Sequence, residues 1–219
     1  AALPSLIFIA LILKEPDLGT ALVCAGVTAL MLWLAGMNFK YLGYAALAST
    51  PVLYFMLFRV PWRRDRLLAF LNPESDPLGK GYHILQSLIA VGSGGFKGVG
   101  YMDGAAKLFY LPEPHTDYIF ANIAQELGLL GSLTVVGLFV FIGYRGMRAA
   151  ILSRDPFARF LAFGITATIL IQAFFNISVV LALVPTKGIT LPFVSYGGTS
   201  LFIMLVLVGV LLNITREVD

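Results

Sequence analysis

The chain has 219 residues, of which 58% are hydrophobic and only 12% are charged, and its formal net charge is +3. Because soluble domains carry about 25% charged residues, this composition indicates a polytopic membrane protein. The small, scattered net charge excludes a nucleic-acid-binding surface, and the single cysteine excludes an intrachain disulfide. We expect an all-α transmembrane bundle, because the apolar runs lack the period-two alternation of a membrane barrel.

Six apolar runs approach the roughly 20 residues that are needed to cross about 30 Å of hydrocarbon. The first of them is short. In chain order they are Leu3–Leu13, Gly19–Leu34, Tyr41–Phe58, Tyr118–Gly143, Phe157–Val184 and Thr199–Ile214. The chain lacks an initiator methionine and opens in apolar sequence, so we interpret residues 1–219 as the C-terminal part of a single membrane domain in a longer protein.

Short-loop arginines predict the orientation of the spans. The loop 144–157 holds Arg145, Arg148 and Arg154, and the positive-inside rule places it in the cytoplasm. Alternation then places residues 14–18, 59–117 and 185–198 outside. The large outer loop 59–117 opens with a basic cluster that an anionic ligand would explain; its members are Arg59, Arg63, Arg64 and Arg66.

The same outer loop predicts structure of its own. Apolar residues at helical spacing over Tyr82–Val91 indicate a short helix that lies on the membrane or dips into it. The glycine-rich run Gly92–Gly100 matches neither a phosphate loop nor a dinucleotide fingerprint. We therefore interpret it as a flexible turn.

Asp117 lies at the junction between the outer loop and the fourth apolar run. Thr116 or Asp117 is in position to cap the helix that begins there. A carboxylate held rigidly at the membrane surface could also act on a lipid-linked substrate, whose reactive head lies at the surface. The two roles are compatible.

Glu126 follows Asp117 by nine residues. On a straight helix it would lie about 13 Å deeper, near the bilayer centre, where a carboxyl group should face the bundle interior or a wet cavity. Asn122 is one turn away and could hydrogen-bond to it. We favour a structural clamp between helices, with Gln172 or Asn176 of the next span as its partner. On a regular helix Glu126 points away from Asp117, which argues against a pair of catalytic carboxylates.

Two turns before the last span combine Pro, Gly and polar residues. Pro and Gly at membrane depth are typical of broken helices that line a cavity, although two interfacial turns fit the composition equally well. Lys187 and the exposed N–H groups around Ser195 could hold phosphate oxygens. No Cys or His grouping has metal-ligand spacing.

These motifs together resemble the SEDS family of bacterial peptidoglycan polymerases, which includes FtsW, RodA and SpoVE. They occur in family order along nearly the whole chain. The matching stretches are residues 16–20, 70–79, 81–83, 86–87, 92–95, 111–120, 126–128 and 191–198. Residues 185–188 favour the division member FtsW, whereas residues 73–76 with 81–83 favour the elongation member RodA; we favour FtsW.

The resemblance implies a ten-span protein of the bacterial cytoplasmic membrane, of which this chain would supply spans five to ten. It implies a glycosyltransferase that joins lipid II into undecaprenyl-diphosphate-linked glycan strands on the outer face, with a class B penicillin-binding protein as partner. The essential aspartate of the family falls on Asp117. Whether a divalent cation, Mg²⁺ or Mn²⁺, assists the reaction stays open.

Our hypothesis is an inverting transfer in which Asp117 is the general base. The candidate substrate-binding residues are Arg59, Arg63, Arg64, Arg66, Lys187 and Ser195. The chief alternative is a transporter that flips the lipid-linked precursor, and it draws support from Glu126. A non-catalytic scaffold for a partner synthase is the third.

Overall fold

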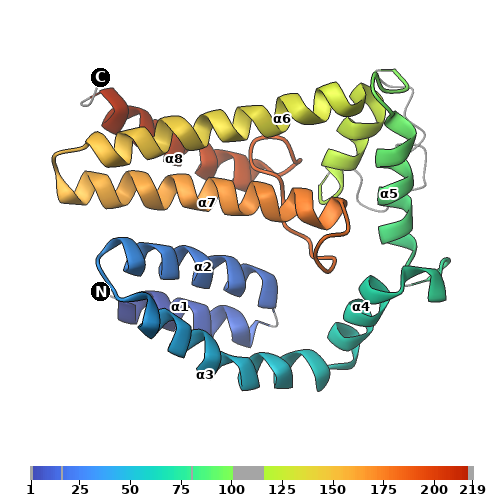
Figure 1. Cartoon of the computed structure of the whole chain (residues 1–219), viewed down its shortest axis with the longest axis horizontal. Helices are drawn as coiled ribbons and strands as arrows, with labels where there is room; N and C mark the ends of the chain where they lie inside the picture. The colour runs from blue at the N-terminus through green and yellow to red at the C-terminus, as the bar shows by residue number, and fades with distance from the viewer. Residues whose placement is uncertain (1, 16, 80, 101–115, 217–219) are drawn as a thin grey trace. The chain divides into compact units, whose positions relative to one another are not determined.

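The computed structural model describes residues 2–15, 17–79, 81–100 and 116–216, and the regular elements of these residues are helices (Figure 1). The predicted all-α class is confirmed. In chain order the elements are α1 (Ala2–Lys14), α2 (Leu18–Leu34), α3 (Phe39–Phe58), α4 (Pro61–Leu71), the 3₁₀ turn η1 (Pro73–Ser75), α5 (Tyr82–Gly94), α6 (Ile119–Leu152), α7 (Pro156–Val180) and α8 (Gly198–Arg216).

All six predicted apolar runs form helices. Among the described residues, α3, α6, α7 and α8 are long and apolar enough to cross a membrane, whereas α1 and α2 are apolar but shorter. The chain is therefore a multi-pass membrane protein. The helix predicted over Tyr82–Val91 is confirmed as α5, and its place at the membrane surface stays a prediction. Helix α4 was not expected, and it carries most of the basic cluster.

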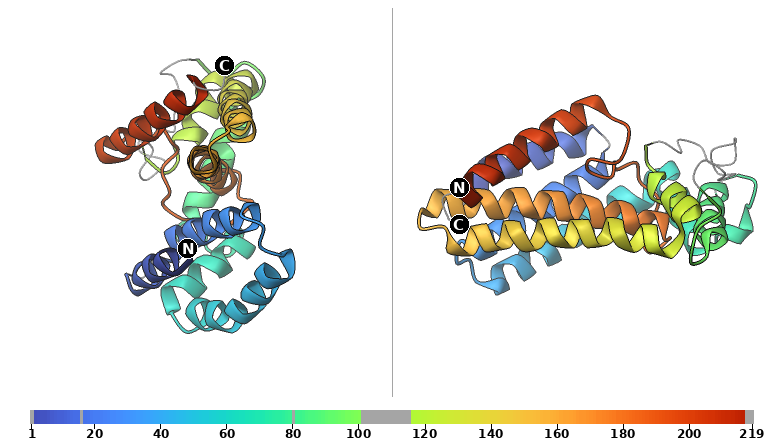
Figure 2. Two further views of the ribbon diagram at one scale, coloured as in Figure 1. Left: turned by 90° about the vertical axis from the view of Figure 1, so that its left-hand side faces the viewer. Right: turned by 90° about the horizontal axis from the view of Figure 1, so that it is seen from above.

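The chain divides into two compact units, and the first comprises residues 1–54, 141–171 and 202–219. Within it, α1 and α2 pair as a hairpin (Figure 1). Asp17 caps α2 by accepting hydrogen bonds from the Thr20 backbone N–H (3.0 Å) and hydroxyl (2.8 Å). The last turns of α6 lie antiparallel to the first turns of α7 (Figure 2), and Gly146 allows the close approach of Thr166.

The second unit comprises residues 55–140 and 172–201 and contains α4, η1, α5 and the segment 181–197 that joins α7 to α8. Its core includes Ile84, Ala121, Val180 and Leu191, none of which is more than 2% exposed. The Ser87 hydroxyl on α5 donates to the carbonyl of Val180 (3.1 Å). Burial of apolar side chains thus joins α5, the start of α6 and the end of α7.

Helix α6 is broken at Gly128, whose backbone angles are φ 64° and ψ −158°. This conformation is accessible essentially only to glycine. Figure 1 shows the first part of α6, up to Leu127, turned away from the rest of the helix. The remaining part, Leu129–Leu152, is about 36 Å long and could span a bilayer alone.

The glycine-rich run satisfies the backbone groups that the break releases. The N–H groups of Val99 and Gly100 donate to the carbonyls of Gln125 and Glu126, at 3.0 and 3.2 Å. Leu129 N–H donates in return to the carbonyl of Gly95 (2.9 Å). The expected turn is thus confirmed only for residues 95–100, which pack against the α6 backbone, whereas residues 92–94 belong to α5.

The break modifies one prediction. The predicted span Tyr118–Gly143 falls within α6, but the helix changes direction at Gly128. Glu126 lies before the break, at the end of the short first part of α6, where its carbonyl accepts from the Gly100 N–H of the glycine-rich turn. Its depth in the membrane stays a prediction.

Candidate functional site

Residues 116–118 form the turn that precedes α6, and side chains from two other segments hydrogen-bond to its backbone. Asn176 on α7 donates to the carbonyl of Asp117 (2.9 Å). Ser195 donates its hydroxyl hydrogen to the carbonyl of Thr116 (2.6 Å) and accepts from the N–H of Leu191 (2.7 Å). The carbonyl of Asp117 is therefore hydrogen-bonded to α7, and the carbonyl of Thr116 to the segment 181–197.

The Asp117 carboxylate lies against Gly188 and remains partly exposed. A methyl group built on the Cα of Gly188 would be 2.7 Å from Oδ2 of Asp117. Only a glycine leaves room for the carboxylate in this orientation. Lys187, the predicted phosphate ligand, is next in the chain and is half-buried.

The segment 181–197 holds two non-glycine residues with positive φ, Ala182 (52°) and Phe193 (65°). Such angles are uncommon for side chains with a Cβ, and for a bulky aromatic residue they are a genuine outlier. The segment reverses direction after α7, where the N–H of Leu183 donates to the carbonyl of Ser178 (2.8 Å). This irregular backbone presents Gly188 and Ser195 to the Asp117 turn.

Tyr118 and His83 stack beside Asp117. Their ring centroids are 6.2 Å apart and their planes differ by 12°. Burial, and then the Arg66 charge, lowers the pKa of His83. Burial and the Asp117 charge raise the pKa of Tyr118 to about 12, against the opposing effect of Arg66. At neutral pH both rings of the stack are therefore uncharged.

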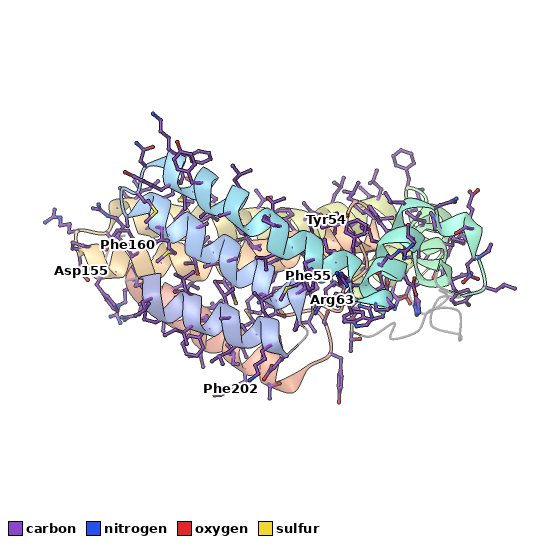
Figure 3. The ribbon with its side chains drawn as sticks, turned by 90° about the horizontal axis from the view of Figure 1, so that it is seen from below. Tyr54, Phe55, Arg63, Asp155, Phe160 and Phe202 are labelled. Atoms are coloured by element: carbon purple, nitrogen blue, oxygen red, sulfur yellow. The ribbon has the colours of Figure 1, made fainter. Side chains whose placement is uncertain are left out.

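The basic cluster does not act as one group. Arg66 is exposed, and its charge reaches His83 and Tyr118. Arg63 is only 7% exposed and donates to the carbonyl of Met56 (3.3 Å), beside the end of α3 (Figure 3). Arg59 lies over the Phe55 ring, 5.2 Å from its centroid, and Arg64 is exposed. The charge of Arg66 thus acts on Tyr118, the residue after Asp117, whereas Arg63 makes a structural contact.

Glu126 and Asn122 are buried, at 6% and 3% exposure. The hydrogen bond between them stays a prediction. Asn176 was expected to pair with Glu126. Its Nδ2 group instead donates to the carbonyls of Asp117 and Ile189. On the neighbouring face, Gln125 Nε2 donates to the Ser93 hydroxyl (3.0 Å) and links α6 to α5.

Comparison with known proteins assigns the family. A family described as cell cycle protein, which groups FtsW, RodA and SpoVE, matches residues 2–219. The chain belongs to the FtsW/RodA/SpoVE family.

Named relatives within the family are similar over most of this chain. It is 47% identical over 211 residues to a probable peptidoglycan glycosyltransferase FtsW of Geobacter metallireducens, which covers 96% of this chain and 56% of the relative. It is 44% identical over 206 residues to the stage V sporulation protein E of Bacillus subtilis, covering 94% and 56%. The chain thus spans a little over half the length of the curated relatives that it matches.

Two solved structures share the fold. One comes from a study of the structural coordination of polymerization and crosslinking by a peptidoglycan synthase complex. It superposes with a TM-score of 0.77 at 30% identity, covering 99% of this chain and 60% of that chain. The other is a mutant of the Thermus thermophilus rod shape determining protein RodA, with a TM-score of 0.64 at 25% identity, covering 99% and 56%.

The FtsW/RodA/SpoVE motif before α6 is only partly described, since residues 111–115, including His115, lie outside the described residues. Sequence reasoning missed the site roles of His83, Tyr118, Asn176 and Gly188. His83 and Gly188 stood inside family motifs, and Asn176 was a polar residue in an apolar run. Their contacts, with Tyr118 for His83 and with Asp117 for Asn176 and Gly188, join positions that are far apart in the chain.

No three His, Cys, Asp or Glu side chains gather as a metal site within residues 2–15, 17–79, 81–100 and 116–216. These residues therefore do not by themselves fit a protein-enclosed metal centre. The suggested Mg²⁺ or Mn²⁺ stays an untested prediction.

Proposed function

We propose that this chain belongs to a peptidoglycan glycosyltransferase that polymerises lipid II, and that Asp117 is its general base. One observation carries the proposal. The Asp117 carboxylate is partly exposed, yet its turn is fastened by two polar side chains and its orientation is set by Gly188. A base must hold such a fixed position within reach of the proton that it removes.

The reaction is a transfer between two lipid-linked sugars. Asp117 takes the proton from the acceptor hydroxyl, and that oxygen attacks the anomeric carbon of the donor. The new glycosidic C–O bond forms as the bond to the lipid diphosphate breaks. The diphosphate leaves with the electron pair, so attack from the opposite side inverts the anomeric centre.

The leaving diphosphate requires positive charge close to the base. Arg66 supports this role, because its charge already acts on Tyr118 next to Asp117. Lys187 supports it through its place beside Gly188. Fixed cations stabilise charge as it develops on the leaving group. Arg59, Arg64 and the remaining hydrogen-bonding capacity of Ser195 are secondary candidates, and the contacts of Arg63 favour a structural role.

We place the reaction on the outer face of the bacterial cytoplasmic membrane. The Asp117 turn precedes α6, and the arginine-bearing turn follows it; Arg154 lies in that turn and Arg159 donates to the Ser153 carbonyl (3.1 Å). If α6 crosses the membrane once, the two turns lie on opposite sides. The positive-inside rule then assigns the Asp117 turn to the outside.

We further propose a role in cell division with a class B penicillin-binding protein as partner. The similarity to proteins named FtsW supports the division role, and the likeness to a peptidoglycan synthase complex supports the partner.

The test is lipid II polymerisation by the purified full-length protein. Replacing Asp117 with Asn should lower the rate by about 10²- to 10⁴-fold, the usual contribution of a general base. Asp155→Asn is the matched control, because Asp155 caps α7 by accepting from the Ala158 N–H (2.9 Å) and Asn caps equally well.

Three outcomes would redirect the proposal. Polymerisation at the parent rate by the Asp117→Asn protein would refute the base and favour the scaffold. If the Asp117→Asn protein lost lipid II flipping in liposomes but still polymerised lipid II, the result would favour the transporter. An added chelator that abolishes activity would show that a divalent cation takes part.

A further inference from the structure

Asn176 is placed to do more than hold α7 together. Its side chain is 1% exposed and lies four residues before the end of α7. One amide group, Nδ2, donates to two carbonyls, those of Asp117 (2.9 Å) and Ile189 (2.6 Å). These carbonyls belong to the base itself and to the residue that follows Gly188.

The chemistry of the amide explains why this position needs asparagine. An NH₂ group carries two hydrogens, and here each hydrogen has its own carbonyl acceptor. The reverse orientation of the amide would place its oxygen against two carbonyl oxygens, so the hydrogen-bond pattern fixes the orientation. Aspartate has the same shape but no hydrogens to donate, and alanine leaves both buried carbonyls without this donor.

We propose that Asn176 is the positioning residue for Asp117, because it sets the distance between the base and the Lys187–Gly188 turn. The inference rests on the proposed function. A single amide ties both backbones, so the carboxylate of Asp117 and the backbone at Gly188 keep a fixed separation. Asn176 itself stays buried behind the turn and touches no reacting atom.

Gly188 is the point at which this spacing matters. A methyl group on Gly188 would be only 2.7 Å from Oδ2 of Asp117, so the carboxylate occupies the space that a side chain at this position would fill. A small displacement of the Asp117 turn or of the backbone at Gly188 would therefore rotate the carboxylate away from the acceptor hydroxyl. Misplacement of a catalytic group by about 1 Å can cost about 100-fold in rate.

The experiment compares Asn176→Ala, Asn176→Asp and Asn176→Ser in the full-length protein, with kcat and KM for lipid II measured per folded molecule. We expect kcat to fall by about 10- to 100-fold for the Ala and Asp proteins while KM stays nearly unchanged. The Ser protein retains one donor, so its kcat should lie between theirs and the parent value.

Thr166→Val is the matched control. Thr166 is on the same helix, is equally buried at 1% exposure, and donates to the Ala162 carbonyl of its own helix (2.7 Å). Its loss should lower thermal stability while kcat per folded molecule stays at the parent value. If the Asn176→Ala protein does not fold, the milder Ser protein carries the same comparison.

Parent kcat and KM in the folded Asn176 proteins, with only the yield or thermal stability reduced, would overturn the inference and leave a purely structural role. This failure is distinguishable from failure of the proposed function, which would show as polymerisation by Asp117→Asn. A rise in KM at unchanged kcat would also overturn the inference, because it would indicate a substrate-binding role.

Discussion

Replacing Gly188 with Ala should impair catalysis while leaving the fold intact. The added methyl group would lie 2.7 Å from Oδ2, 3.4 Å from Cγ and 3.6 Å from Oδ1 of Asp117. Ordinary contact begins at 3.4 Å, so the oxygen must move by about 0.7 Å, the difference between 3.4 and 2.7 Å. Because the obstructed atom ends a flexible side chain, the backbone need not shift.

A displacement of this size should lower kcat by about 10- to 100-fold. That range corresponds to about 1.4–2.7 kcal/mol in activation free energy. The free energy of unfolding should change little, because Ala at a compatible backbone position restricts the unfolded chain and offsets a small native-state strain.

The assay is single-turnover polymerisation of lipid II alongside thermal unfolding in detergent. Gly209→Ala is the control, since it makes the same change in α8 where no atom lies within 4 Å of the new methyl group. A parent-like kcat for Gly188→Ala, in a preparation where Asp117→Asn is inactive, would refute the idea that Gly188 orients the carboxylate.

Three further outcomes are expected. Gly128→Ala should lower the free energy of unfolding by at least about 1–3 kcal/mol, because the backbone conformation at Gly128 strains any residue with a Cβ. Gly137→Ala is the control and should cause no such loss. Equal melting temperatures of the two proteins would contradict the α6 break. His83 has a lowered pKa, so stability should fall as pH drops below about 6.5, and His83→Gln should flatten that dependence in thermal unfolding. Arg66→Ala removes a charge that lowers the pKa of His83, so this pKa should rise towards its ordinary value. A His83 pKa that is unchanged in the Arg66→Ala protein would show that Arg66 does not act on the stack.

The helices and the general place of the site were predictable from the sequence. Apolar runs specify membrane helices because lipid forces every backbone group to find an internal partner. The polar junction before Tyr118 stood out for the same reason. These signals are local, and each is contained in about 20 consecutive residues.

The break in α6 was not predictable, because a lone glycine in an apolar run does not show its conformation. Gly131, Gly137 and Gly164 stay within helices, whereas Gly128 does not. The difference lies in what Gly128 meets, namely the backbone of Lys97 and Gly98, about thirty residues earlier. Such long-range contacts leave no periodic pattern.

The role of Asn176 was hidden for a related reason. The sequence shows a polar residue in a span and predicts that it must find a partner. It does not show which partner, because Asp117 is 59 residues away and Ile189 lies beyond the end of the helix. The irregular segment 181–197 folds back on α7, and this reversal brings the three residues together.

The interruption of α6 has a consequence for how the protein adapts to its lipid environment. Spans adapt to bilayers of different thickness by tilting, at a modest energetic cost. The long part Leu129–Leu152 changes direction at Gly128, so its tilt need not equal the tilt of the short helix that follows the Asp117 turn. The break would thus let the long part adjust to the membrane thickness without requiring an equal rotation of the Asp117 turn.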